Sequence, residues 1–179
     1  MSKSHFIRPT GVSRDALVVR LGAGSGAANN FTQNETGKLV KWVGESRYDL
    51  CAAGDIIHAA IVSVEPATSG GFSIGGIDDG DRMYAIADGL QATPGTGSIA
   101  VGDYVVAGSV TAKGTALATY PKVCKATVQI GTAPADLAAA GQQAAMAAAG
   151  AWRVVSILKE SGPAAVGDTI VIAPVAKKA

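Results

Sequence analysis

The acidic residues of one glycine-rich segment are the first candidates for chemistry in this sequence. Asp78, Asp79 and Asp81 stand close together within Gly76–Arg82. Carboxylates in such a loop, together with main-chain oxygens, can coordinate a calcium ion. A twelve-residue calcium loop also needs a glutamate at its last position, and none follows at that place. The segment therefore favours an acidic hairpin turn over a calcium site.

The histidines and cysteines form no recognisable catalytic set. His5 stands near the N-terminus, and His58 lies within the apolar run Asp55–Glu65. A general base needs a positioned partner, and neither histidine belongs to a recognisable catalytic motif. We expect His58 to be packed in a core or an interface. Cys51 and Cys124 do not belong to a Cys-x-x-Cys pair. We interpret them as buried free thiols, with a disulfide bridge as the alternative.

Two short segments resemble fragments of the signature motifs of dUTPases, which are trimeric β enzymes. They are Tyr48–Ala52 and Gly76–Arg82. The Gly-Arg-Ser-Ser phosphate-binding motif expected between them is absent, and so is the glycine-rich C-terminal motif. The segment Gly22–Gly26 likewise lacks the Lys-Ser/Thr pair of a phosphate loop. The sequence therefore predicts no catalytic residue, no cofactor and no metal site, and a protein that is not an enzyme.

Charge and composition narrow the remaining function classes. The formal net charge of the 179 residues is +1, too small for the dense Lys/Arg face that binds nucleic acid. No stretch approaches the ~20 apolar residues that a membrane-spanning helix needs. Hydrophobic residues make up 48% of the chain but aromatic residues only 5%, so small and β-branched side chains must build the core. Such a core gains little free energy per residue, and contacts with partners would add to its stability.

Short strand candidates separated by turns follow one another from residue 38 onward. Lys122–Ile130 alternates apolar and polar residues, which is typical of a strand with one face in water. Asp55–Glu65 is apolar on both faces, as in a strand covered on both sides. We therefore predict a mainly β fold, a small β-barrel or β-sandwich. The other strand candidates are Lys38–Val43, Arg82–Ala87, Tyr104–Ala107, Trp152–Lys159 and Asp168–Ala173.

A four-residue pattern, Ala-x-Gly-Asp, precedes three of the strand candidates. Its copies are Ala52–Asp55, Ala100–Asp103 and Ala165–Asp168. Glycine supplies the positive φ of a tight turn, and aspartate can hydrogen-bond the main chain of that turn. We interpret the copies as one device for entering a strand. A carboxylate cluster is the alternative, but the unequal spacing gives the three aspartates no reason to converge.

The chain divides into an extended N-terminal arm, residues 1–36, and a β-rich domain, residues 37–179. The arm is rich in glycine and carries an apolar patch that could pair with the sheet edge of another protein, with a free terminus as the alternative. The candidate interaction residues are Phe6, Leu17, Val18, Val19 and Leu21. Within the domain, an Ala-rich segment that has Pro134 and Asp136 at its start predicts a helical insertion at about residues 134–149.

The chain from residue 37 onward resembles the capsid decoration (cement) proteins of tailed bacteriophages. The similarity lies in the segments Gly37–Val40, Gly114–Leu117, Trp152–Val155 and Val166–Ile172 and in the Ala-x-Gly-Asp turns. It implies a compact β-barrel or β-sandwich, commonly a homotrimer, that binds the major capsid protein on the outer surface of an assembled virion. It brings no catalytic residue.

Nucleic acid and membrane are not expected as partners, and the protein would be made in the host cytoplasm. The alternatives are another phage head or tail structural subunit, a carbohydrate- or ligand-binding β-module and, as the least favoured, a dUTPase-like enzyme.

Overall fold

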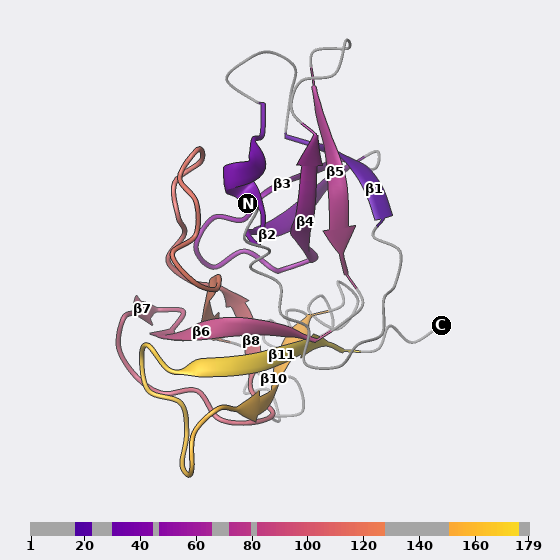
Figure 1. Cartoon of the computed structure of the whole chain (residues 1–179). Helices are drawn as coiled ribbons and strands as arrows, with labels where there is room; N and C mark the ends of the chain where they lie inside the picture. Colours follow the sequence, from indigo (N-terminus) through magenta and orange to yellow (C-terminus); the bar gives the residue numbers. More distant parts are fainter. Residues whose placement is uncertain are drawn as a thin grey trace.

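The computed structural model describes residues 17–22, 30–44, 47–65, 72–79, 82–127 and 151–175. Strands dominate this part of the chain, which confirms the mainly β fold predicted from the sequence. Figure 1 shows two lobes, an upper one built from β1–β5 and a lower one built from β6–β11. The helical insertion predicted at residues 134–149 lies outside the described residues.

The first lobe is a closed barrel of five strands in the order β1-β3-β2-β4-β5. Its elements are β1 (Leu17–Leu21), the 3₁₀-helix η2 (Gln33–Glu35), β2 (Leu39–Gly44), β3 (Arg47–Leu50), β4 (Ala59–Glu65) and β5 (Ser73–Asp78). Neighbouring strands are antiparallel except for β1 and β3, which are parallel. The barrel core consists of Val19, Leu21, Phe31, Val40, Ala59, Ile61, Val64 and Ile77.

The second lobe is also closed, because β6 and β11 pair and complete a ring with β10, β8 and β9. Its strands are β6 (Met83–Leu90), β7 (Thr93–Pro94), β8 (Tyr104–Ala107), β9 (Lys122–Lys125), β10 (Trp152–Ile157) and β11 (Thr169–Pro174). The short strand β7 is attached to β6 outside the ring. Here the only parallel neighbours among the described strands are β6 and β9.

The two barrels share one topology. In chain order, β1, β2, β3, β4 and β5 correspond to β6, β8, β9, β10 and β11, and each pair of neighbouring strands in one barrel has a counterpart of the same direction in the other. The registers agree as well. The matched residue pairs are Ile61↔Ile77 with Val154↔Ile172, Val40↔Ala59 with Val105↔Trp152, Arg20↔Arg47 with Ile86↔Lys122, Val40↔Leu50 with Val105↔Lys125, and Leu17↔Ile77 with Met83↔Ile172.

An irregularity of the sheet is repeated too. A bulge lies between Ile61 and Ser63 in β4, and a bulge lies between Val154 and Ser156 in β10. Bulges bend a strand and fix its register, so their coincidence supports the match. The sequences around them agree as Ile-Val-Ser-Val and Val-Val-Ser-Ile. The chain is therefore a tandem pair of one five-stranded barrel unit.

Four glycine turns are fastened to strands by the same pair of main-chain hydrogen bonds, which we name the glycine clamp. The glycine N–H donates to the carbonyl of one strand residue, and the N–H of that strand residue donates to the carbonyl of the residue after the glycine. The clamps are Gly37–Lys38 on Ile61, Gly54–Asp55 on Ala107, Gly102–Asp103 on Val154 and Gly167–Asp168 on Ala87. The φ angles of the four glycines lie between 85° and 94°, a region in which a side chain causes strain.

Three of the clamps are the Ala-x-Gly-Asp copies, and their interpretation as turns is confirmed. In each copy the aspartate carboxylate accepts a hydrogen bond from the alanine N–H three residues earlier, at 2.7–2.8 Å. Each carboxylate also pairs with one lysine ammonium. The pairs are Lys41–Asp55 at 2.7 Å, Lys125–Asp103 at 3.0 Å and Lys159–Asp168 at 2.8 Å. Each aspartate therefore stabilises its own turn by a hydrogen bond within that turn.

Each barrel core contains one large aromatic side chain, and the two come from different places. Phe31, just before η2, is buried in the first core, and Trp152, at the start of β10, is buried in the second. By register, Trp152 stands where the first barrel has the small Ala59. The same strand framework is therefore filled by different packing, which is how related barrels with divergent sequences keep their interior volume.

Residue 36 is not a structural boundary, although the sequence suggested an arm that ends there. Strand β1 pairs with β3 and β5, and η2 follows it, so both belong to the first barrel. The physical reason is that β1 takes its partners from later in the chain, which a local pattern does not show. The structure divides the β-rich region into two barrels, with the division between β5 and β6.

Replacing Asp103 tests the turn chemistry. Asp103→Ala removes the acceptor for the Ala100 N–H and the partner of Lys125. We expect the free energy of unfolding to fall by about 1.5–3 kcal/mol, because the lost hydrogen bonds involve a charged group. Asp103→Asn should cost less, since its amide oxygen still accepts. Urea denaturation measures both, and Asp79→Ala at an exposed site is the control. Equal midpoints for Asp103→Ala and the control would contradict the assignment.

Candidate functional site

The two barrels meet in a buried seam. Gly54 and Asp55, from the first barrel, clamp Ala107 in β8 of the second, with hydrogen bonds of 2.7 Å and 2.9 Å. Apolar side chains of the first barrel also join the core of the second, and they are Leu39, Cys51, Ile57 and Ala60. Main-chain hydrogen bonds and apolar burial therefore act together to hold the lobes in one arrangement.

A loop of the second barrel reaches back to η2 of the first. This loop, residues 108–121, connects β8 to β9 and rises beside η2 in Figure 1. The Glu35 carboxylate accepts a hydrogen bond from the Gly114 N–H, and the Lys38 ammonium donates to the Ala112 carbonyl at 2.8 Å. The Glu35 and Lys38 side chains lie 3.4 Å apart and are both buried. We name Glu35, Lys38 and loop residues 112–114 the latch.

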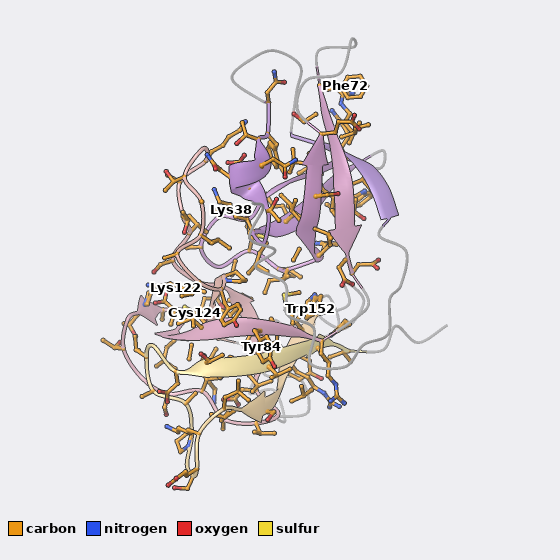
Figure 2. The ribbon with its side chains drawn as sticks, viewed as in Figure 1. Lys38, Phe72, Tyr84, Lys122, Cys124 and Trp152 are labelled. Carbon is orange, nitrogen blue, oxygen red and sulfur yellow. The ribbon has the colours of Figure 1, made fainter. Side chains whose placement is uncertain are left out.

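Asp88, at the end of β6, holds the same loop at its two ends. Its carboxylate accepts the Ser109 N–H at 2.7 Å and lies 3.4 Å from the Lys122 ammonium at the start of β9. A side chain at position 108 would meet this carboxylate, because a Cβ on Gly108 would lie only 3.0 Å from it. Figure 2 shows Lys38 in the upper lobe and Lys122 in the lower one. The loop is thus tied to both barrels by buried charges.

Both buried carboxylates are stabilised in their ionised form. Burial raises the pKa of Glu35, but hydrogen bonds from Thr32 and Gly114 and the charge of Lys38 outweigh it, so the pKa lies below its ordinary value. Burial also raises the pKa of Asp88, and hydrogen bonds from Ser109 with the charge of Lys122 bring it below the ordinary value. The pKa of Lys38 is lowered, because burial outweighs the attraction of Glu35.

The first barrel has an open edge at the position where the second is clamped. Register matching places Trp42 of β2 where β8 has Ala107. The pairing of β2 with β4 covers only Leu39 and Val40, so no strand in the described part of the chain continues along that edge. Trp42 is 55% exposed and Val43 36% exposed. We name Trp42, Val43 and their main chain the Trp42 edge.

The residues proposed from the sequence as interaction sites do not form one exposed surface in the described part of the chain. Val19 and Leu21 are buried in the core of the first barrel. The main chain of Leu17 and Val18 pairs with β5. Phe6 lies outside the described residues. Val19 and Leu21 therefore contact their own chain, whereas Trp42 and Val43 are among the exposed large apolar residues of the described part.

The acidic residues near position 78 do not form a metal site with other described residues. Asp78 is buried at the end of β5, Asp79 is exposed, and Asp81 lies outside the described part. Within the residues that the structure describes, no group of three or more His, Cys, Asp or Glu side chains could hold a metal ion. His58 is half-buried just before β4, and its main-chain N–H donates to the Val40 carbonyl at 2.9 Å.

The two cysteines are free and buried, which confirms the interpretation made from the sequence. Burial raises the pKa of Cys51 to about 12 and that of Cys124 to about 11. Both thiols are therefore neutral near pH 7 and poor nucleophiles. Neither one carries the activation that a catalytic or metal-binding cysteine needs.

Comparison with known proteins gives no relative. No family model matches the chain, and no match is found among curated proteins or among solved structures. The described residues also include no helix that is long and apolar enough to cross a membrane.

Sequence reasoning missed the latch, although a signal for it exists. Glu35-Thr36-Gly37-Lys38 has the glycine spacing of the Ala-x-Gly-Asp turns and leads into β2 as Ala100–Asp103 leads into β8. The charged residues at its ends conceal this likeness. Trp42 had no distinguishing signal, because its exposure depends on where β4 stops pairing with β2.

Removing one charge of the latch should destabilise the fold. Glu35→Gln leaves the buried Lys38 ammonium without its counter-charge, and we expect a loss of about 3–5 kcal/mol in the free energy of unfolding. The double variant Glu35→Gln, Lys38→Met removes both charges and should recover much of that loss. Chemical denaturation of the three proteins gives the coupling energy. Additive effects would contradict a coupled pair.

The pH dependence of stability provides an independent test of the contribution of Glu35. Since the pKa of Glu35 is lowered on folding, its contribution is present above the ordinary glutamate pKa and is lost as the pH falls through the folded value. The denaturant concentration at the unfolding midpoint of the unaltered protein should therefore decrease when the pH is lowered below about 4, near the ordinary carboxyl range. The drop should be smaller in the double variant. An identical pH profile would show that Glu35 does not contribute.

Proposed function

We propose that this protein is a capsid decoration protein that binds the outer surface of an assembled phage shell and stabilises it. The Trp42 edge is the observation that best supports a protein-binding role. An exposed strand edge offers main-chain donors and acceptors to an added segment, and an exposed tryptophan beside it is a frequent centre of binding energy. The partner proposed for this edge is the major capsid protein.

A decoration protein must be rigid before it binds, because ordering on the shell would weaken its affinity. The seam and the latch provide this rigidity, since they fix two barrels with main-chain hydrogen bonds and buried charges. A ligand that binds only the assembled lattice stabilises that state by mass action. The site on the shell would therefore be formed where capsid subunits meet.

Self-association into a homotrimer is the second part of the proposal. Two exposed valines, Val101 and Val166, occupy the variable position of two Ala-x-Gly-Asp turns and are 60% and 43% exposed. The loops that carry them are joined by the bridge between Ile99 and Ala164, so the two turns belong to one face of the second barrel. Burying this apolar surface between subunits would add stability that the small-residue core does not supply.

Substituting Trp42 tests the shell-binding site. Trp42→Ala should reduce co-sedimentation with emptied shells of the same phage at least tenfold in apparent affinity, because the edge loses its aromatic anchor. Val110→Ala, at a residue 54% exposed in a different loop, is the matched control and should bind normally. Unassembled capsid protein should bind neither. Full binding by Trp42→Ala would exclude this edge, and equal binding to unassembled capsid protein would contradict the cement mechanism.

The oligomeric state tests the second part. Light scattering should give the mass of three chains for the unaltered protein, each chain being 17.8 kDa. The double variant Val101→Glu, Val166→Glu should dissociate, because it places charges in an apolar contact. Val110→Glu should remain associated. A monomer of the unaltered protein at high concentration would contradict self-association.

A further inference from the structure

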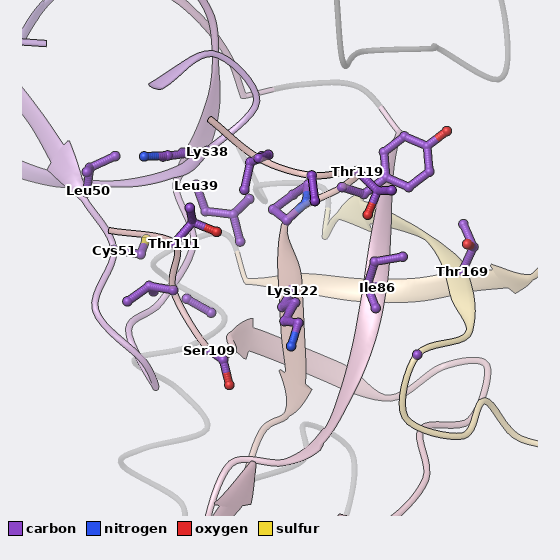
Figure 3. Close-up of a pocket in the computed structure, with 17 residues that line it drawn as sticks. Lys38, Leu39, Leu50, Cys51, Ile86, Ser109, Thr111, Thr119, Lys122 and Thr169 are labelled. Carbon is purple, nitrogen blue, oxygen red and sulfur yellow. The ribbon is translucent and has the colours of Figure 1, made fainter. Parts of the chain in front are cut away.

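A pocket of about 520 Å³ lies at the junction of the two barrels, beneath the loop of residues 108–121 (Figure 3). The first barrel contributes Leu39, Leu50 and Cys51 to its wall, and the second contributes Ile86 and Leu117. Its volume and its place between two folded units are those of small-molecule sites in proteins. Neither Trp42 nor Val43 lines this pocket, so binding of a molecule in the pocket is independent of shell binding at the Trp42 edge.

The shape of the pocket is fixed before any ligand arrives. The covering loop is held by the latch at residues 112–114, and by Asp88 at Ser109 and Lys122. The charged side chains in these contacts belong to the two barrels, and the loop contributes main-chain groups to them. The loop is therefore prevented from collapsing onto the wall, and a ligand would not have to pay for ordering it.

The charges around the pocket are already compensated. Lys38 and Lys122 are the only Lys, Arg, Asp or Glu residues among the described residues that line it. The ammonium of Lys38 is occupied by Glu35 and the Ala112 carbonyl, and that of Lys122 by Asp88. Cys51 adds no charge near pH 7, because burial raises its pKa to about 12. An ion entering this space would lose hydration without gaining a counter-charge.

We propose that this pocket binds a small uncharged molecule that is mostly apolar and carries one or two hydrogen-bonding groups. Leucine, isoleucine and cysteine side chains form the apolar wall, while Thr111, Thr119 and Thr169 bring hydroxyl groups to it. Figure 3 shows these groups around one space between the ribbons of the two barrels. Because the wall comes from both barrels, a bound molecule contacts both and stabilises their arrangement.

Two dyes with the same ring skeleton test the ligand class on the full chain. N-phenyl-1-naphthylamine is neutral, and 1-anilinonaphthalene-8-sulfonate differs from it by one sulfonate. The neutral dye should show saturable fluorescence enhancement and should bind at least tenfold more tightly than the sulfonate. It should also raise the unfolding temperature. No saturable binding of the neutral dye, or equal or tighter binding of the anionic dye, would overturn the proposal.

Filling the pocket locates the binding. Ala118 and Thr119 line the pocket and are exposed, so Ala118→Phe and Thr119→Phe place a ring in it without disturbing a core. Each should weaken binding of the neutral dye at least tenfold. Ala92→Phe, at an exposed turn away from the pocket, is the matched control and should bind normally. Unchanged binding in both pocket variants, with an unfolding transition like that of the control, would show that the dye binds elsewhere.

Discussion

The glycine clamp recurs at points where a strand of these barrels would otherwise end without a neighbour. It consists of two main-chain hydrogen bonds between a glycine turn and a single strand residue. A core of small and β-branched side chains gains limited free energy from burial, so unpaired main-chain groups would be costly to leave inside it. The glycine clamp satisfies them with very little chain. Three of the clamps extend the pairing of neighbouring strands within a barrel, and the fourth, Gly54 and Asp55 on Ala107, joins the two barrels. The latch and the pocket beneath the loop lie between the same two barrels that this clamp joins.

The buried charges have a different structural role from the clamps. The clamps set the register of the strands, whereas Glu35, Lys38 and Asp88 position a loop that has no regular structure of its own. Buried ion pairs contribute little net stability compared with apolar residues of the same shape, but they favour one arrangement over others. Here that arrangement keeps an accessible space open between two barrels that apolar packing alone would tend to fill.

The sequence predicted the mainly β class, the turn role of the Ala-x-Gly-Asp copies and the free, buried cysteines, because these follow from local pattern and residue chemistry. It did not predict that β1 closes a barrel, since the partners of Leu17–Leu21 lie more than 25 residues away along the chain. The tandem arrangement was missed for a related reason. The two units agree in register and in the bulge near Ile61 and Val154, but little sequence similarity remains. The exposure of Trp42 results from pairing geometry, for which composition gives no signal.

The seam between the barrels is heterologous: a turn of the first unit meets an edge of the second, and the two surfaces are unlike. Units joined in this manner resemble links in an open chain, in which every junction uses one turn and one edge. The described residues contain one such junction, and the matching edge of the first unit, at Trp42, carries no glycine turn from them. The two barrels therefore differ at this position although they share one topology: one edge is closed by the neighbouring unit, and the other is open to an added strand or turn.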